Sequence, residues 1–166
     1  MLIVLRNTGM RVGELLRLRL NDIDIDNKSL MVRSTKTNNY RIIPINSELE
    51  DTLLWLIHNY VEPRNFTVSL RSDKQSIYLF CHPDGSRIKS IRHSFNNACR
   101  RAGIKATVHI LRHSFASHLV MNGVDLVSIK ELLGHTSINT TMIYSHVSDT
   151  HKIKSVAKLP WLQAGD

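Results

Sequence analysis

The C-terminal half of the chain carries several helical segments, each with its own start or stop signal. Apolar spacing predicts helices in close succession, over residues 89–102, 108–121 and 125–133, and from 136 onward. Gly123 and Gly134 stand where the second and third should end, and Asp125 is a favourable cap for the third. This half is therefore expected to contain three or four helices in quick succession.

The N-terminal part also contains residues that start or stop short helices. An apolar run over residues 1–5 has no capping residue ahead of it, which indicates a fragment whose upstream sequence has been removed. The run is broken by Thr8-Gly9, because glycine is the usual helix stop. A second helix is expected over residues 11–19, and a third begins with Ser47 as its cap.

A hairpin pattern lies between these helices. Residues 30–33 and 40–45 are short β-branched or apolar runs, and they flank the polar, Asn-rich link 36–39. A short strand is also expected at residues 78–80, before a Pro-Asp-Gly turn at 83–85. The expected fold is α+β and mainly helical, with a small antiparallel β-sheet near one edge.

Composition favours a single cytoplasmic domain with a polyanionic partner. The 166 residues carry a formal net charge of +8, and no acidic tail offsets it. Cys81 and Cys99 lack CxxC spacing and fit buried thiols in a reducing compartment. No secretory signal or apolar run of about 18 residues is visible, so secretion and membrane spanning are disfavoured.

The helix predicted from residue 108 combines an apolar stripe with cationic neighbours. The stripe consists of Leu111, Phe115 and Leu119. His109 and Arg112 are expected on its flank. An arginine beside a core is costly unless a partner receives its charge, and the guanidinium fork matches two oxygens of a phosphate. Arg11, just after the Thr8-Gly9 break, is a candidate second fork.

Other cationic residues have simpler interpretations. His109 and His113 are four residues apart and could form a metal pair, but Ile110 stands where a zincin needs glutamate, so a zinc hydrolase is disfavoured. His113 is therefore expected to be structural. Arg33 and Arg41 are expected to line DNA or to face solvent.

Five motifs occur in series along almost the whole chain: Thr8–Leu15, the hairpin with Lys36 and Arg41–Pro44, His109–His113, Leu133–His135 and Tyr144–His146. Together they resemble the catalytic domain of the tyrosine recombinases, the phage-integrase and Xer-type site-specific recombinases. The resemblance implies the DNA breaking-rejoining fold of that domain over residues 1–166. Its core would be about 1–148, with 149–166 as a C-terminal segment or arm. An N-terminal core-binding domain would lie upstream of this chain.

The resemblance also implies six catalytic residues: Arg11, Lys36, His109, Arg112, His135 and Tyr144. Tyr144 would attack the scissile phosphorus to give a 3′-phosphotyrosyl link and a free 5′-hydroxyl. The two arginines would clamp the phosphate, and Lys36 would protonate the leaving oxygen. His109 would assist proton transfer, His135 would hydrogen-bond a non-bridging oxygen, and Glu14 would orient the site. No metal or other cofactor is implied.

The implied function is site-specific recombination or integration of double-stranded DNA, as in the topoisomerase IB reaction. The full-length protein would act as a tetramer on DNA, with the segment after Ser148 as a contact between neighbours. Two other functions remain open. One is a recombinase-derived module that binds DNA without cutting it, and the other is a metal-dependent nuclease or hydrolase.

Overall fold

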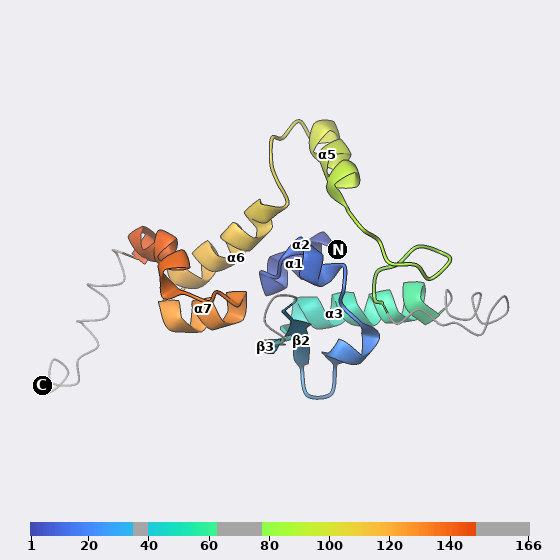
Figure 1. Ribbon diagram of the computed structural model, residues 1–166, viewed down its shortest axis with the longest axis horizontal. Coiled ribbons are helices and arrows are strands. Elements are labelled where there is room, and N and C mark those ends of the chain that lie inside the picture. Colours follow the sequence, from blue (N-terminus) through green and yellow to red (C-terminus); the bar gives the residue numbers. More distant parts are fainter. Residues whose placement is uncertain (35–39, 63–77, 149–166) are drawn as a thin grey trace, which may run out of the picture.

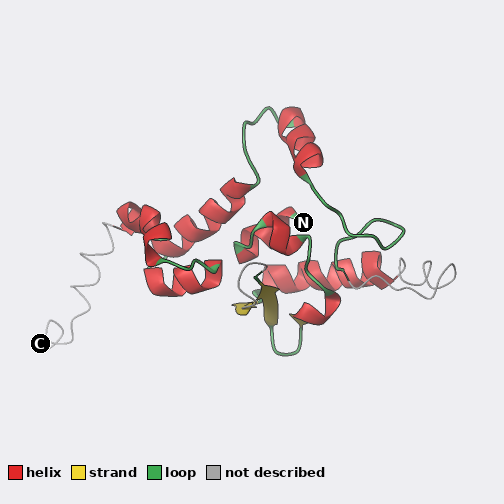
Figure 2. Ribbon diagram, viewed as in Figure 1, coloured by secondary structure: helices red, strands yellow, loops and turns green. Residues whose placement is uncertain are grey.

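The computed structural model describes residues 1–34, 40–62 and 78–148, with side chains to residue 145. The N-terminal elements are α1 (Leu2–Thr8), α2 (Val12–Leu15), the 3₁₀ turn η1 (Leu20–Asp22), β1 (Ile23–Asp24), β2 (Ser29–Arg33), β3 (Tyr40–Pro44), α3 (Ser47–Leu56) and the π-helical turn η2 (Ile57–Val61). The C-terminal elements are α5 (Arg92–Arg101), α6 (His109–Met121), α7 (Leu126–Leu133) and the 3₁₀ helices η3 (Ile138–Thr140) and η4 (Met142–Ser148). The predicted mainly helical α+β fold is confirmed (Figure 2).

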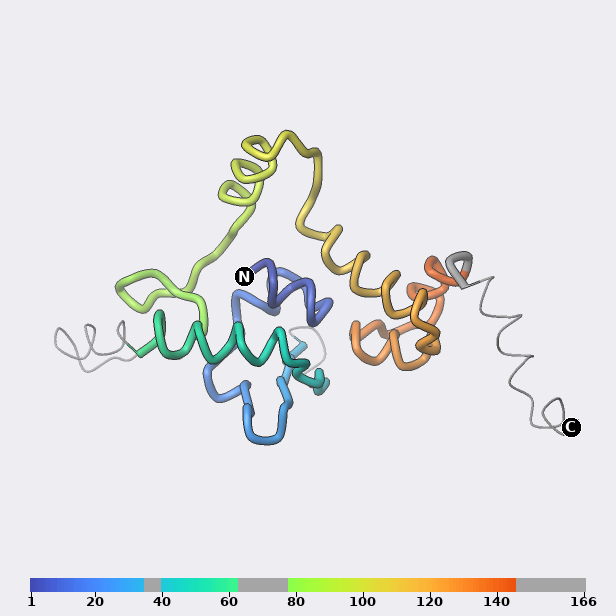
Figure 3. Tube along the Cα trace, turned by 180° about the vertical axis from the view of Figure 1, so that it is seen from behind, coloured from blue at the N-terminus to red at the C-terminus, as the bar shows by residue number. Residues whose placement is uncertain are grey.

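Helix α1 lies at the centre of the molecule, between α3 and α6 (Figures 1 and 3). Its apolar residues Val4 and Leu5 belong to the main hydrophobic core, together with Leu15, Leu49 and Leu53. Because α3 and α6 both pack on α1, the residues that follow α1 lie between the other N-terminal elements and α6.

The sheet has three antiparallel strands in the order β1-β2-β3. Leu30 pairs with Ile43, and Val32 pairs with Arg41, so the predicted hairpin is confirmed. Lys36 and the rest of the link 36–39 lie outside the described residues. The inward face of β3 carries the buried Ile43 and, two residues earlier, Arg41.

Helix α2 is shorter than the predicted segment 11–19. It ends at Leu15, and the chain then becomes extended, so that Arg19 forms an isolated antiparallel bridge with Tyr78. The Leu18 carbonyl also accepts a hydrogen bond from the Leu79 N–H, at 2.9 Å. These contacts with a segment about 60 residues later end the helix, and local sequence could not predict them. The strand expected at residues 78–80 is only this bridge.

The N-terminus of α3 lies one residue earlier than expected. Asn46, not Ser47, is the cap, and its side chain accepts a hydrogen bond from the Leu49 N–H at 2.9 Å. The predicted start of the helix is otherwise correct. The turn at 83–85 is also present, with Gly85 N–H donating to the His82 carbonyl.

The C-terminal helices follow the predicted punctuation. Asp125 caps α7 by accepting hydrogen bonds from Val127 and Ser128, and Gly134 ends it in the left-handed conformation, at φ 65°. A second, smaller core lies between α6, α7 and η4, and consists of Ala116, Val120, Ile129, Leu133 and Tyr144. The last predicted helix forms, but as the two 3₁₀ pieces η3 and η4.

Helix α5 stands away from the two cores and is joined to α6 by an extended link (Figure 1). Cys81 and Cys99 are both free and buried, as expected. Within residues 1–34, 40–62 and 78–148, none of the helices combines the length and apolar character needed to cross a bilayer.

Candidate active site

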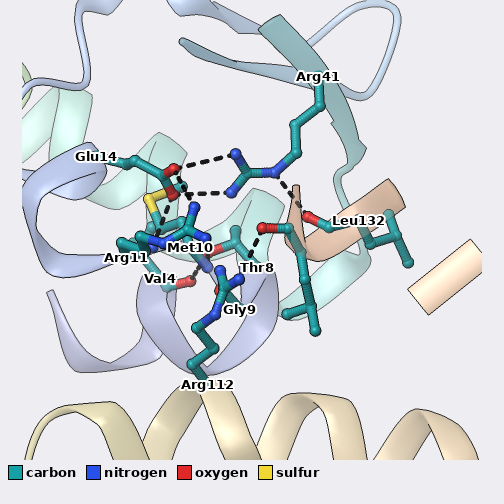
Figure 4. A network of polar contacts seen from close by, with 10 residues as sticks. Val4, Thr8, Gly9, Met10, Arg11, Glu14, Arg41, Arg112 and Leu132 are labelled. Atoms are coloured by element: carbon teal, nitrogen blue, oxygen red, sulfur yellow. Dashed lines mark hydrogen bonds and ion pairs between the residues drawn. The ribbon is translucent and has the colours of Figure 1, made fainter. Parts of the chain in front are cut away.

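The Glu14 carboxylate is the centre of a charged network between α2 and the sheet (Figure 4). It accepts hydrogen bonds from the backbone N–H of Arg11 at 2.7 Å and from Arg11 Nη1 at 3.1 Å. Arg41 binds the same carboxylate through Nη1 at 3.2 Å and Nη2 at 2.8 Å. Burial alone would raise the pKa of Glu14, but the contacts with Arg41 and Arg11 outweigh it and lower that pKa. Glu14 is therefore ionised, and it holds two guanidinium groups near each other.

Arg112 enters the same region from α6, although it is only 7% exposed. Its Nη1 donates to the Gly9 carbonyl at 2.6 Å, and Nη2 donates to the Leu133 carbonyl at 2.8 Å. Burial, reinforced by the charge of Arg11, lowers the pKa of Arg112 to about 10, so the group stays charged at neutral pH. The fork thus joins the end of α1 to the end of α7.

The burial of Arg112 corrects the predicted orientation of α6. The fully buried positions are Ala116 and Val120, which share a face with Arg112, whereas the predicted stripe is only half-buried. That stripe was Leu111, Phe115 and Leu119. Arg112 is tolerated inside because two backbone carbonyls accept its N–H groups.

Gly9 allows the close approach that this contact needs. Its φ is 59°, in the left-handed region, and a Cβ placed there would lie 2.4 Å from Cδ1 of Phe115. Only glycine fits both the backbone conformation and the space. The turn after α1 can therefore press against α6 and present its carbonyl oxygen to Arg112.

Arg41 does not face solvent, so that alternative was wrong, whereas the other alternative, that it lines DNA, stays a prediction. Its side chain is 13% exposed, and Nε donates to the Leu132 carbonyl at 2.7 Å while the Nη groups bind Glu14. The alternation along β3 could have revealed this, because Arg41 shares the inward face with Ile43. Arg33 does point outward, as expected, with its side chain 58% exposed and paired with Asp22.

His135 follows directly after the glycine that ends α7. Its Nδ1 lies 2.9 Å from Oγ1 of the fully buried Thr141. Burial, followed by the charges of Arg112 and Arg11, lowers the pKa of His135 to about 4. The ring is therefore neutral at neutral pH and carries one N–H.

An open cavity of about 730 Å³ lies against part of this network. Its lining includes Arg11, Glu14, Arg41, His135 and Lys130. The Arg11 side chain is 45% exposed, so it remains accessible although it is paired with Glu14. Four cationic residues, Arg11, Arg17, Arg41 and Lys130, line the cavity together with the single carboxylate of Glu14, so the cavity is suited to an anion such as a phosphate.

Tyr144 is buried in the second core, near enough to Arg112 for that charge to affect its pKa. Its hydroxyl is 2.8 Å from Nδ1 of His113, and the two rings are 5.9 Å apart. Burial raises the pKa of Tyr144, although the charge of Arg112 opposes the shift. His113 is thus a partner of the candidate nucleophile, which its expected structural role did not anticipate. His113 is the last residue of the motif His109–His113, but nothing in that motif indicates its contact with Tyr144.

The structure therefore brings together only part of the predicted site. Arg11 and His135 line the same cavity, and Arg112 binds the Leu133 carbonyl two residues before His135. His109 is exposed at the first residue of α6. Lys36 lies outside the described residues, so its place in the site stays a prediction.

The fold is that of tyrosine recombinase catalytic domains. The catalytic domain of bacteriophage HP1 integrase is similar over 99% of this chain and 84% of its own, with a TM-score of 0.68 and 29% identity. XerH site-specific recombinase, in a post-cleavage complex with palindromic difH substrate, is similar over 95% of this chain and 44% of its own, with a TM-score of 0.71 and 26% identity.

The chain belongs to the phage integrase family, whose model matches residues 1–151. Tyrosine recombinase XerA of Pyrococcus furiosus is 36% identical over 97% of this chain. The chain spans 54% of the length of that relative, and about half of the other curated relatives.

Proposed function

We propose that the protein cleaves and rejoins double-stranded DNA at specific sites, through a covalent link to Tyr144. The observation that carries the proposal is that Arg11 and His135 line one cavity, while Arg112 binds the Leu133 carbonyl two residues before His135 and lies near enough to Tyr144 to affect its pKa. Similarity to XerA and to the DNA-bound XerH supports the substrate class. The net charge of +8 supports a polyanionic partner.

The two arginines would hold the scissile phosphate. The fork of Arg11 is oriented by Glu14 and opens into the cavity, and Arg112 is fixed by two carbonyls behind it. Both would neutralise the extra negative charge of the pentacoordinate transition state. Removing one such fixed donor typically lowers the rate by about 10²–10³-fold.

In the chemical step, the Tyr144 oxygen forms a bond with phosphorus, while the bond from phosphorus to the 5′-oxygen breaks. The phenol proton passes to a base, for which we propose His109, and the departing 5′-oxygen takes a proton from an acid, for which we propose Lys36. The reverse step uses a 5′-hydroxyl as the nucleophile. Because the phosphotyrosyl link conserves the bond, rejoining needs no ATP.

His135 would donate a hydrogen bond to a non-bridging oxygen. Its Nδ1 is the nitrogen beside the Thr141 hydroxyl, so we assign the single proton of the neutral ring to Nε2. A neutral donor stays in this form across the whole neutral pH range. The clamp would then combine two cations with one neutral N–H.

Tyr144 must leave its present place before it can react. Its hydroxyl is bonded to His113 and its ring is buried, and both hold the phenol in the protonated state. Docking of DNA against η3 and η4 is the step that would release it. In the full-length protein we propose a tetramer on DNA, with residues 149–166 as the contact between neighbours.

The test uses sheared chromosomal DNA of the source organism, nicked at random so that short ends diffuse away after cleavage. The full chain is incubated with this DNA in EDTA, quenched in detergent and digested with nucleases. Mass spectrometry should find a nucleotide 3′-phosphate on Tyr144. The Tyr144→Phe variant should bind the same DNA and give no adduct.

Two results would replace the proposal. DNA binding without any adduct in the native chain would indicate a module that binds and does not cut. Cleavage that appears only when a divalent metal replaces EDTA, and survives Tyr144→Phe, would indicate a metal-dependent nuclease.

A further inference from the structure

We propose that Arg41 is a positioning residue of this site: it holds Glu14 in place for Arg11 and fixes the end of α7 from which His135 extends. Its effect on catalysis rests on the proposed function, whereas its effect on the geometry does not. Three groups of contacts, on the carboxylate, on the helix end and on the sheet, carry the inference.

The first contact is with the carboxylate. Each oxygen of Glu14 is shared: Oε1 receives Nη1 of Arg11 and Nη1 of Arg41, and Oε2 receives the Arg11 N–H and Nη2 of Arg41. Without Arg41, the buried carboxylate would have Arg11 as its remaining cation. Arg11 would then be drawn further onto Glu14 and away from the cavity. Arg41 thus keeps the Arg11 fork available by occupying the other side of Glu14.

The second contact is with the end of α7. Leu132 and Leu133 have neighbouring carbonyls at a helix C-terminus, where cations are favourable. Arg41 Nε binds the first, and Arg112 Nη2 binds the second. A Cβ on Gly134 would lie 2.8 Å from Nη1 of Arg41, so the guanidinium lies directly against the residue before His135. The starting point of His135 is therefore set by Arg41 and Arg112 together.

The third feature is the place of Arg41 on β3, from which its side chain links the sheet to α2 and α7. Arg41 and Ile43 are on the inward face of β3, so the strand is anchored in the main core two residues away. The side chain is 13% exposed and lies between β3, α2 and α7. One rigid strand is thereby joined to the two segments that carry Arg11 and His135.

Arg33 is a matched control on the neighbouring strand. It also pairs with a buried carboxylate, with Nη2 2.9 Å from Oδ1 of Asp22, which is 3% exposed. Its side chain is 58% exposed, and its carboxylate partner belongs to η1 instead of α2. Arg33→Met therefore removes a cation from the same sheet without touching the contacts described above.

The first experiment reads geometry alone. Arg41→Met, Arg41→Lys and Arg33→Met are made in the full chain, and the Arg11 amide and His135 ring signals are followed by NMR. Both should move in Arg41→Met, and partly in Arg41→Lys, because lysine keeps the charge but cannot bind Glu14 and Leu132 together. Neither should move in Arg33→Met. Unchanged signals in Arg41→Met would overturn the inference, as would failure of both Arg41 variants to fold.

The second experiment separates positioning from DNA contact. The rate of Tyr144 adduct formation at saturating nicked DNA should fall by about 10²-fold in Arg41→Met, comparable to loss of a fixed donor. The dissociation constant for the DNA should change by less than about 3-fold, since surface phosphate contacts are retained. Arg33→Met should leave the saturated rate unchanged. A loss of affinity that matches the loss of rate would make Arg41 a DNA contact.

The two experiments keep the proposals distinct. If the native chain forms no adduct, the proposed function fails while the NMR result still decides the role of Arg41. If the adduct forms and Arg41→Met cleaves at the native rate, only the inference about Arg41 fails.

Discussion

The arginine cluster around Glu14 and the segment that carries Tyr144 are built in different ways. Arg11, Arg41 and Arg112 are each held by charged or backbone partners from another part of the chain, or by the central Glu14. Tyr144 instead lies on a short 3₁₀ helix, and one hydrogen bond to His113 holds its hydroxyl. The first region joins α1, α2, β3, α6 and α7, while the second rests on a small apolar cluster.

The difference indicates which part must be ready before DNA arrives. A charge clamp stabilises a transition state best when its dipoles are already fixed, because no reorganisation is then needed during reaction. A nucleophile that is buried and protonated is protected from premature attack and can be supplied by a small local movement. The predictions below probe this division, from the largest expected effect to the smallest.

Arg112→Ala should have the largest effect because it removes both a clamp and a structural link. Adduct formation should fall by about 10²–10³-fold. The carbonyls of Gly9 and Leu133 would lose their donors, and each buried orphan costs about 1–3 kcal/mol of unfolding free energy. Single-turnover cleavage and chemical denaturation would measure the two losses. Arg101→Ala, at the exposed end of α5, is the control for stability; equal destabilisation by both changes would contradict the structural role of Arg112.

Gly9→Ala should damage the clamp region without altering any charge. The left-handed backbone costs an alanine about 1–2 kcal/mol, and the clash with Phe115 adds about 1–3 kcal/mol. Denaturation midpoints would measure the change. Gly103→Ala is a matched control, because Gly103 has a similar φ of 67° but open space around it. It should show the backbone cost alone, so equal losses at both positions would contradict the close packing of Gly9 on α6.

His113→Phe should show how weakly the nucleophile is held. The ring remains, but the hydrogen bond to the Tyr144 hydroxyl is lost, at a cost of about 1 kcal/mol in unfolding free energy. A double-mutant cycle with Tyr144→Phe should recover a coupling energy of about the same size. Additive single changes would show that the two side chains do not interact in solution.

The last prediction has no effect at neutral pH and concerns stability in acid. The pKa of His135 is about 4 in the folded protein and 6.5 as its ordinary value, so the unfolded chain binds its proton first as pH falls. The free energy of unfolding is therefore unaffected by this ring above about pH 6.5 and decreases as the pH falls towards 4. NMR titration of the ring should give a midpoint near 4, and His135→Gln should flatten the stability profile across this window. A midpoint at the ordinary value would place the ring away from the arginines.

Local sequence signals predicted the elements whose ends are set locally. Gly9, Asp125 and Gly134 begin or end helices as expected, because caps act within one helical turn. The helix predicted over residues 11–19 was too long, because Arg19 forms a β-bridge with Tyr78, which is distant in sequence. The Asn46 cap was missed by one residue, since asparagine and serine are almost equally good caps.

The candidate site was predicted as a set of residues, but not as a network. Motif spacing identified Arg11, Arg112 and His135, which the fold brings together. It did not identify the link from Arg41 to Leu132, whose residues are 91 positions apart. Nor did it pair His113 with Tyr144, because that contact depends on how the 3₁₀ segment folds back onto α6. Contacts of this kind follow from packing and have no local pattern.

Because η3 and η4 are 3₁₀ helices, the chain before Tyr144 would become longer if these helices unfolded. The segment between Gly134 and Tyr144 begins at a fixed point, because Gly134 packs against Arg41. A 3₁₀ helix rises about 2.0 Å per residue and an extended chain about 3.3 Å, so uncoiling the five 3₁₀ residues of the segment 138–143 would lengthen the chain by about 6 Å. The phenol could then travel to a distant phosphorus while every arginine stays where it is.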